Sequence, residues 1–375
     1  MRLLKVLPPL EHILGAKLVL ISHLHLDHIG SLDYLDLMEG NKTNVYIPHR
    51  NYYEEVLAEH WRYSWKSVLI PKTSYSRKHL LDIRQCNLKI IHPVKNFHST
   101  FPSYSYVIES QEGTLLYTGD MRVKSILRVF SQEPIANEIF SQLYGKEDYD
   151  FIRYISERFQ EIDLLIIEGT NFGRPLTPLQ PEEFVNLISK LMVAHPSIVS
   201  LHTLDLESFI AVALIAYIKR LPVTIYSTRI VRFLCHTLDA RILHELNISY
   251  TGRKTLPTID LEYISPNEAL KEFSTHKRII VTDYETVDIA RVLMEYKVNR
   301  PILAILVTSE PLNEEYGIEI EKQIEWLRLA GVQPYRIRVS GHYYPHEIVE
   351  LKNNLKFKKV IPIHTERPEL IRKVL

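Results

Sequence analysis

The sequence predicts an α/β protein with more than one domain. The chain has 375 residues, whereas a typical domain holds roughly 100–200. Short apolar runs alternate with amphipathic segments of helical length, which is typical of parallel α/β units. A proline-rich stretch beginning at Asn171 and a second crossing near Pro311 interrupt this alternation, and such stretches commonly connect domains. We therefore expect two domains, with chain crossings at these two places.

The part of the chain before the first crossing is expected to be rich in strands. The turn Gln111-Glu112-Gly113 indicates a hairpin, because glycine follows polar residues between two apolar runs. The expected strands are Leu18–Ser22, Leu88–Ile91, Tyr104–Glu109, Thr114–Thr118 and Leu164–Glu168.

The rest of the chain is expected to alternate helix and strand. The expected helices are Glu182–Ala194, Leu206–Arg220, Arg229–Leu246, Glu285–Tyr296, Ile318–Ala330 and Pro345–Leu355. The expected strands are Ile198–Leu201, Val223–Tyr226, Arg278–Thr282, Ile302–Thr308, Tyr335–Val339 and Val360–Ile363.

Composition excludes several classes of protein. Lysine plus arginine equals aspartate plus glutamate at 45 each, so net charge indicates no general attraction to nucleic acid or membrane. Only Cys86 and Cys235 are present, which excludes a disulfide framework. The N-terminus lacks the pattern of a secretory signal, and no apolar run is long enough to span a bilayer. These observations favour a cytoplasmic protein without a membrane partner.

Four chemically active side chains lie within six residues of sequence: His23, His25, Asp27 and His28. His23 and His25 are two positions apart at the end of an expected strand, so their side chains leave it in similar directions. Asp27 and His28 fall in the turn that begins the next helix. Imidazole and carboxylate groups suit zinc and related metals. A lone histidine is usually structural, but this dense spacing favours a metal site.

Three later residues stand in similar positions. His98, Asp120 and His364 each lie at the end of an apolar strand or in the adjoining loop. In open α/β sheets, ligands collect at strand ends. Each signal is weak alone, but together with the first cluster they indicate a larger metal centre.

In this order, the motifs resemble the signature of the metallo-β-lactamase superfamily. Glu168, with Thr170 after it, resembles the acidic motif of the β-CASP subgroup. Ser340-Gly341-His342 and Pro362-Ile363-His364-Thr365-Glu366 resemble the two late histidine motifs of that subgroup. The similarity runs from about Leu18 to the C-terminus and is strongest to archaeal ribonuclease J-like proteins and to the cleavage and polyadenylation endonucleases.

The resemblance implies a metallo-β-lactamase αββα sandwich interrupted by an inserted α/β β-CASP domain. The first part of the sandwich would be residues 1–170, the insertion 171–311, and the last part of the sandwich 312–375. Family members normally carry more strands and an aspartate motif before the first histidine cluster. Only 22 residues precede His23, and none resembles that motif, so we expect part of the sheet to lack its cover.

The resemblance also implies a ribonuclease with two zinc ions in each chain. His23, His25 and His98 would hold one zinc ion, and Asp27, His28 and His364 the other, with Asp120 bridging. In such a centre the two metals activate a hydroxide that attacks the phosphodiester.

The remaining implied roles concern the substrate and the geometry of the ligands. Asp27 would orient the hydroxide, and Glu168 would fix the orientation of a ligand. His342 would give a proton to the leaving oxygen or bind the scissile phosphate. Ser340, Gly341 and Ser99 are the expected substrate contacts.

The implied partner is RNA, with single-stranded DNA as a second candidate and a homodimer left open. The basic stretch 352–359 lies between the two late histidine motifs, where it would either favour backbone phosphates or form the solvated end of a helix. Endonuclease and 5′ exonuclease action are both compatible with the motifs. Two other hypotheses stay open: a metal-binding but inactive RNA-processing subunit, and a lactamase-fold hydrolase of small esters or thioesters.

Overall fold

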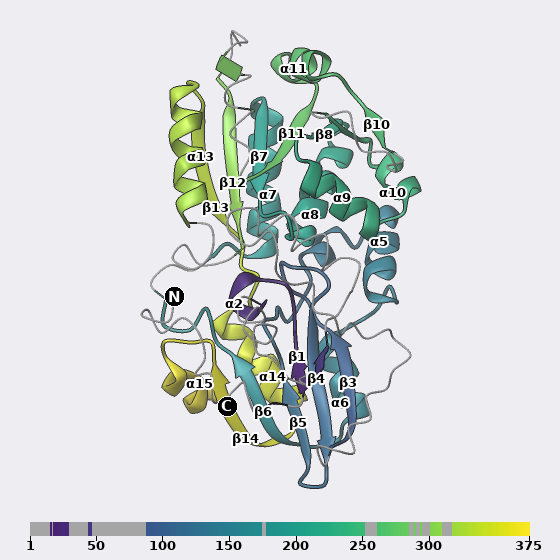
Figure 1. Cartoon of the computed structure of the whole chain (residues 1–375), viewed down its shortest axis with the longest axis vertical. Helices are drawn as coiled ribbons and strands as arrows, with labels where there is room; N and C mark the ends of the chain where they lie inside the picture. Colours follow the sequence, from purple (N-terminus) through teal and green to yellow (C-terminus); the bar gives the residue numbers. More distant parts are fainter. Residues whose placement is uncertain are drawn as a thin grey trace, which may run out of the picture. The chain divides into compact units, whose positions relative to one another are not determined.

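The structure is a computed structural model of the chain (Figure 1). It describes residues 16, 18–29, 44–46, 88–174, 178–251, 261–284, 289, 293–294, 301–309 and 317–375. The chain divides into two compact units. Unit 1 comprises residues 1–123, 151–173 and 345–375, and unit 2 comprises residues 124–150 and 174–344. The predicted mixed α/β fold is confirmed.

Unit 1 contains a five-stranded sheet in the order β14-β6-β5-β4-β3. Its strands are β3 (Leu88–Lys95), β4 (Tyr104–Ser110), β5 (Thr114–Tyr117), β6 (Ile162–Glu168) and β14 (Phe357–Ile363). The pairs β3–β4 and β4–β5 are antiparallel, whereas β5–β6 and β6–β14 are parallel. The predicted hairpin is confirmed. Gly113 has φ +135° in its turn, and a side chain there would strike Asp163.

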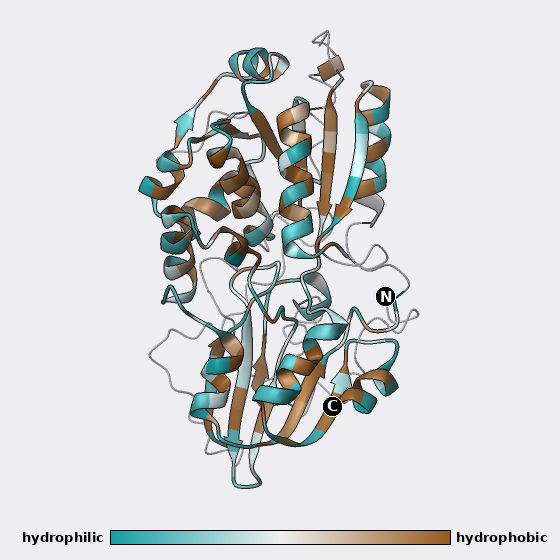
Figure 2. Cartoon of the chain, turned by 180° about the vertical axis from the view of Figure 1, so that it is seen from behind, coloured by the Kyte–Doolittle hydropathy of each residue, from teal (hydrophilic) through white to brown (hydrophobic). Residues whose placement is uncertain are grey.

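The two faces of this sheet meet different layers. Val107, Leu116 and Leu165 are paired neighbours on one face and are fully buried. Helices lie over one face of the sheet when the unit is seen from behind (Figure 2). The helices of unit 1 include α6 (Phe151–Arg158), α14 (Ile348–Asn354) and α15 (Pro368–Val374).

A second, two-stranded sheet contacts the face opposite Val107. It consists of the parallel strands β1 (Leu18–Leu20) and β2 (Asn44–Tyr46). The rings of Tyr46 and Tyr106 meet edge to face with centroids 6.2 Å apart, and the Tyr106 hydroxyl donates to the carbonyl oxygen of Ile21. The described part of unit 1 thus stacks two sheets. The expected gap in the cover of the sheet concerns residues 1–15, which lie outside the described part.

Unit 2 contains a seven-stranded sheet in the order β10-β9-β8-β11-β7-β12-β13. All of its strand pairs are parallel. The strands are β7 (Ser197–Leu201), β8 (Val223–Ile225), β9 (Ile248–Tyr250), β10 (Glu262–Tyr263), β11 (Ile279–Asp283), β12 (Leu303–Thr308) and β13 (Gln333–Arg338). The helices include α7 (Pro181–Ala194), α8 (Leu206–Ile218), α9 (Thr228–Thr237), α10 (Ala240–Glu245), α11 (Pro266–Ser274) and α13 (Gly317–Leu329).

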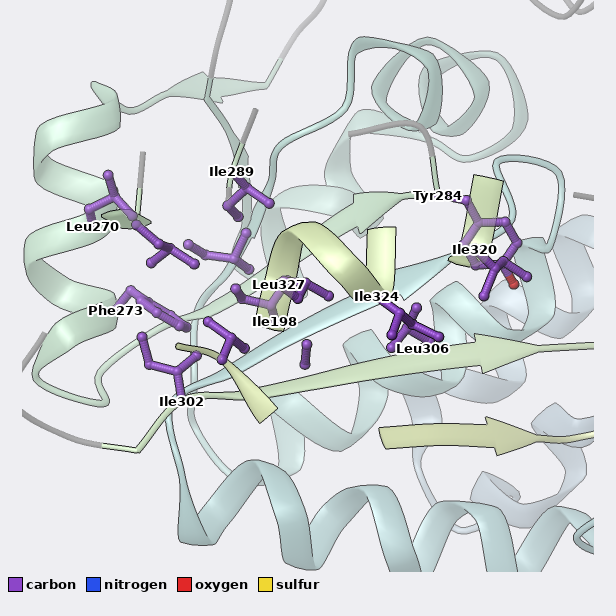
Figure 3. Close-up of a cluster of buried hydrophobic side chains, with 14 residues drawn as sticks. Ile198, Leu270, Phe273, Tyr284, Ile289, Ile302, Leu306, Ile320, Ile324 and Leu327 are labelled. Atoms are coloured by element: carbon purple, nitrogen blue, oxygen red, sulfur yellow. The ribbon is translucent and has the colours of Figure 1, made fainter. Parts of the chain in front are cut away.

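The core of unit 2 follows from the composition of its central strands. Every residue of β7, β11 and β12 is buried, which is typical of parallel strands that are covered on both faces. A cluster that includes Ile198, Leu270, Phe273, Leu306 and Ile324 joins these strands to α11 and α13 (Figure 3). The edge strand β13 carries hydrophilic residues that β12 lacks (Figure 2).

The segment 124–150 belongs to unit 2, although we expected all of residues 1–170 in the first domain. It forms the 3-10 helix η3 (Ile126–Phe130) and helix α5 (Pro134–Tyr144). The hydroxyls of Ser125 and Tyr144 both donate to the buried carboxylate of Glu207 on α8. These two hydrogen bonds join the segment to α8 within unit 2.

The expected boundary near residue 311 also differs from the structure. We expected residues 312–375 to belong to the lactamase domain. However, β13 pairs with β12 from Leu303↔Gln333 to Thr308↔Arg338, so the chain leaves unit 2 only after Tyr344.

Most expected elements appear near their expected ends. The single helix expected over Arg229–Leu246 is two helices, α9 and α10, since Asp239 begins a new one. The helix expected over Glu285–Tyr296 lies largely outside the described residues. Within the described part, no helix has the length and apolar character needed to cross a membrane.

Candidate metal centre

The first histidine cluster lies in a loop directly after β1. His23 and His25 are buried in this loop, and their backbone is followed by the short helix α2 (Leu26–Ile29). The backbone amides of His28 and Ile29 both donate to the carbonyl oxygen of His25, which begins the helix. This turn places Asp27 and His28 beside the two preceding histidines.

His23, His25 and His98 form the first group of candidate ligands. One potential ligand atom from each residue lies within 4.8 Å of the others. The Nδ1 atom of His25 is 3.2 Å from His23 Nε2 and 3.3 Å from His98 Nε2. All three side chains are buried. Three imidazole nitrogens that converge in this way suit a divalent metal such as zinc.

Asp27, His28, Asp120 and His364 form the second group, again with ligand atoms within 4.8 Å of one another. The His28 Nε2 atom is 3.0 Å from Asp120 Oδ2 and 3.4 Å from Asp27 Oδ2. The His364 Nε2 atom is 3.3 Å from Asp27 Oδ2. Two carboxylates and two imidazoles are likewise a donor set for a divalent metal.

The two groups lie side by side. Asp120 Oδ2 is 3.7 Å from His23 Nε2, and the ring centroids of His23 and His28 are 4.0 Å apart. Asp120 follows Gly119 directly after β5, and Asn96 fixes this turn by donating to the carbonyl oxygens of Thr118 and Asp120. Asp120 therefore contacts ligands of both groups. The arrangement fits a pair of divalent cations, which stabilise charge on both sides of a bond under attack.

In four of the five candidate histidine ligands, a hydroxyl group lies beside one ring nitrogen, and the other nitrogen of the same ring faces the cluster of ligands. Ser22 Oγ is 3.1 Å from His23 Nδ1 and 3.3 Å from His28 Nδ1. Thr100 contacts His25 Nε2, and Thr170 Oγ1 is 2.6 Å from His364 Nδ1. Histidines that bind metal commonly use the other nitrogen for a hydrogen bond of this kind.

Burial and charge set the protonation of this centre. Burial lowers the pKa of His23 well below its usual value, and the neighbouring imidazoles act in the same direction. Burial also acts to lower the pKa of His28, but the charge and hydrogen bond of Asp120, together with Asp27, raise it well above its usual value. Burial acts to raise the pKa of Asp27, yet hydrogen bonds from His28 and His364 hold it far below its usual range.

Glu168 reaches the centre through Thr170. Its carboxylate is buried at the end of β6 and accepts a hydrogen bond from the Thr170 amide at 2.8 Å. Thr170 in turn contacts His364, whose backbone has φ +49°. A positive φ is uncommon for a residue other than glycine, and such strain clusters at functional sites. The role of Glu168 in fixing the orientation of a ligand stays a prediction.

The other expected substrate contacts lie in two places. Ser99 is buried beside His98, with its Oγ 3.4 Å from His98 Nε2. Ser340, Gly341 and His342 follow β13 in unit 2, whereas all seven expected metal ligands belong to unit 1. There the His342 amide donates to Ser340 Oγ at 3.0 Å. Their substrate roles stay predictions.

The basic stretch 352–359 is partly neutralised within unit 1. Lys358 Nζ is 2.6 Å from Asp163 Oδ1 and 3.2 Å from Glu161 Oε2. The Lys352 ammonium donates to the carbonyl oxygen of Val374. Lys356 and Lys359 remain exposed, so the positive charge presented to solvent is smaller than the sequence suggested.

Sequence analysis did not identify Ser22, Asn96 or Thr100. Each is a small polar residue beside an expected ligand, and nothing in the spacing separates it from an ordinary loop residue. Ser22 and Thr100 contact the ring nitrogens that face away from the other ligands, and Asn96 contacts backbone carbonyl oxygens. Neither kind of contact can be recognised from residue spacing.

Known proteins resemble this chain in sequence pattern and in fold. A sequence profile of the metallo-beta-lactamase superfamily matches residues 12–132. A solved structure titled as a protein of unknown function from Enterococcus faecalis V583 is similar, with 16% sequence identity and a TM-score of 0.62 over 95% of this chain and 77% of that one. At this identity the likeness concerns the fold. No curated protein matches the sequence.

Proposed function

The chain carries a metallo-β-lactamase superfamily domain, and we propose that it is a zinc-dependent ribonuclease of the β-CASP type. One observation carries the proposal: ligand atoms of seven residues from four distant segments converge in two adjacent groups. Such a convergence is expected of a two-metal hydrolase. It is not expected of surface histidines and acids that happen to be neighbours.

The first group, His23, His25 and His98, would hold one zinc ion. Asp27, His28 and His364 would hold the second, with Asp120 shared. Two zinc ions here would supply the Lewis acidity that phosphodiester hydrolysis requires.

The chain's own residues would supply position and protons. The Asp27 side chain is 40% exposed, so it can orient a water molecule that enters from solvent. Glu168 holds Thr170, and Thr170 holds the His364 ring. We assign proton donation to the leaving oxygen to His342, and hydrogen bonds to the phosphate to Ser340, Gly341 and Ser99.

RNA is the proposed substrate because the motifs beyond the superfamily cluster resemble those of nucleases. These are Glu168 with Thr170, Ser340-Gly341-His342, and His364 with its flanking residues. The presence of a separate α/β unit between segments of unit 1 supports the same proposal. A hydrolase of small esters would not need these features.

The test measures zinc content and cleavage of end-labelled single-stranded RNA, with single-stranded DNA and a chromogenic ester as parallel substrates. We expect two zinc ions per chain and cleavage of RNA. The variant His342→Ala should keep both zinc ions and lose cleavage. The matched control is His346→Ala, an exposed histidine four residues away, which should retain cleavage.

Other outcomes would overturn the proposal. Two zinc ions without cleavage of either nucleic acid would indicate the inactive RNA-processing subunit. Ester turnover without RNA cleavage would indicate a small-molecule hydrolase. Full RNA cleavage by His342→Ala would remove that residue from the reaction.

A further inference from the structure

Ser22 occupies a special position between the two metal groups. It directly precedes His23 after β1, and its side chain is buried. Its carbonyl oxygen accepts a hydrogen bond from the Tyr104 amide at 3.0 Å. This bond fixes the backbone of Ser22 against the five-stranded sheet and holds its hydroxyl next to the cluster.

The Ser22 hydroxyl contacts one histidine from each group. Its Oγ is 3.1 Å from Nδ1 of His23 and 3.3 Å from Nδ1 of His28. The same side chain is hydrogen-bonded to Tyr117 on β5. Among the hydroxyls described above, Thr100 contacts a ligand of the first group and Thr170 one of the second. Ser22 alone among these three contacts both.

The number of hydrogen bonds that a hydroxyl can make indicates which nitrogens of His23 and His28 carry a proton. A serine oxygen has two lone pairs and one proton. If Nδ1 carries the proton in both rings, His23 and His28 each donate to Ser22 Oγ, and the Ser22 proton goes to the Tyr117 oxygen. All three positions are then used. The Nε2 atoms of both rings then face Asp120, whose Oδ2 is 3.7 Å from His23 Nε2 and 3.0 Å from His28 Nε2.

We infer that Ser22 is a positioning residue whose hydroxyl keeps a proton on Nδ1 of His23 and of His28, which reserves Nε2 of each ring for zinc and so prepares both metal groups at once. The inference rests on the proposed two-zinc centre. Loss of this hydroxyl weakens both sites together, whereas loss of the Thr170 hydroxyl weakens only the second.

Gly119 makes the close approach of this serine possible. It has φ +59°, and a Cβ at this position would lie 2.8 Å from Ser22 Cβ and 3.0 Å from the Tyr104 carbonyl oxygen. Gly119 also directly precedes Asp120. The absence of a side chain thus lets the Asp120 turn and the Ser22 hydroxyl reach the same two histidines.

The first experiment compares zinc affinities by chelator competition in Ser22→Ala, Thr170→Val and Ser103→Ala. Ser103 is the matched control, because it is another buried serine in unit 1, and no bond from its hydroxyl to a candidate ligand is found among the described residues. Supporting groups of this kind change metal affinity by about 10–100-fold. We expect Ser22→Ala to weaken both zinc ions by at least about tenfold, Thr170→Val to weaken one, and Ser103→Ala to weaken neither.

A second measurement separates this inference from the proposed function. Long-range 1H–15N spectra of histidine-labelled, metal-free protein report which nitrogen of each ring carries a proton. We expect a proton on Nδ1 of both His23 and His28 in the wild type, while His28 also donates from Nε2 to Asp120, and partial loss of the Nδ1 proton in Ser22→Ala. A wild type without a proton on Nδ1 of either ring, or unchanged zinc affinities in Ser22→Ala, would overturn the inference. A wild type that binds no zinc but carries both Nδ1 protons would overturn the proposed function and leave this assignment supported.

Discussion

Replacing Asp120 with asparagine should reveal whether one carboxylate serves both metal groups. Asp120 Oδ2 is 3.0 Å from His28 Nε2 and 3.7 Å from His23 Nε2, and its Oδ1 is 3.6 Å from His364 Nδ1. The substitution keeps the shape of the side chain but removes a buried negative charge. Residues that merely support ligands alter metal affinity by about 10–100-fold. Loss of a ligand should therefore cost at least ~100-fold in affinity, or about 2.7 kcal/mol.

The assay is zinc stoichiometry by elemental analysis after dialysis, with affinities from chelator competition. We expect Asp120→Asn to lose the zinc ion of the second group and to bind the other more weakly. In the metal-free protein the pKa of His28 should fall, because its raised value depends on Asp120. Asp163→Asn is the control, since this carboxylate lies on the same sheet but contacts Lys358 and the Thr114 amide. Two zinc ions held by Asp120→Asn with wild-type affinity would refute the assignment of Asp120 as a shared ligand.

Three further predictions follow from the same contacts. The raised pKa of His28 means that protons compete with zinc there, so the affinity of its group should fall about tenfold for each pH unit below that pKa. The first group should keep its zinc ion at lower pH, because the pKa of His23 is lowered. Chelator competition at a series of pH values measures both affinities, and loss of both zinc ions at the same pH would contradict the prediction. Glu207→Leu leaves the Ser125 and Tyr144 hydroxyls without their acceptor, so the free energy of unfolding should fall by about 3 kcal/mol, measured by urea denaturation; an unchanged value would show that the contacts are not formed. Gly119→Ala should lower both the free energy of unfolding and the zinc affinity, because Gly119 has φ +59° and a Cβ there would clash with Ser22 and the Tyr104 carbonyl oxygen. The control Gly331→Ala has a positive φ but open space around it, so it should lower the free energy of unfolding only.

The sequence predicted the central strands of unit 2 well because their burial is visible as composition. β7, β11 and β12 are five or six residues long and consist largely of apolar residues. The strands β9 and β10 have only three and two residues, which is too short for a periodic signal. Helix α11 was missed although its start carries a recognisable signal. Ser265 caps the helix by accepting from the Glu268 amide, and Pro266 takes the first helical position.

The domain boundaries depended on contacts that are not local. Residues 124–150 lie in sequence between β5 and α6, which both belong to unit 1. Their place in unit 2 is set by the buried Glu207, more than sixty residues away, which accepts from Ser125 and Tyr144. Likewise, β13 follows a presumed crossing in sequence, but its pairing with β12 keeps it in the parallel sheet. A pairing partner or a buried charge of this kind cannot be read from a single stretch of sequence.

Some ligands of the candidate metal centre could be predicted from local sequence, and others depend on distant contacts. The spacing of His23, His25, Asp27 and His28 brought these side chains together in the prediction because strand and turn geometry alone relate them. The approach of Asp120 and His364 needs the sheet, since β5 and β14 are both neighbours of β6. The hydroxyls of Ser22 and Thr100 require more, because their function depends on the orientation of each imidazole ring. Several of these rings pack against one another, so these two hydroxyls could be recognised only after the ligands themselves had been placed.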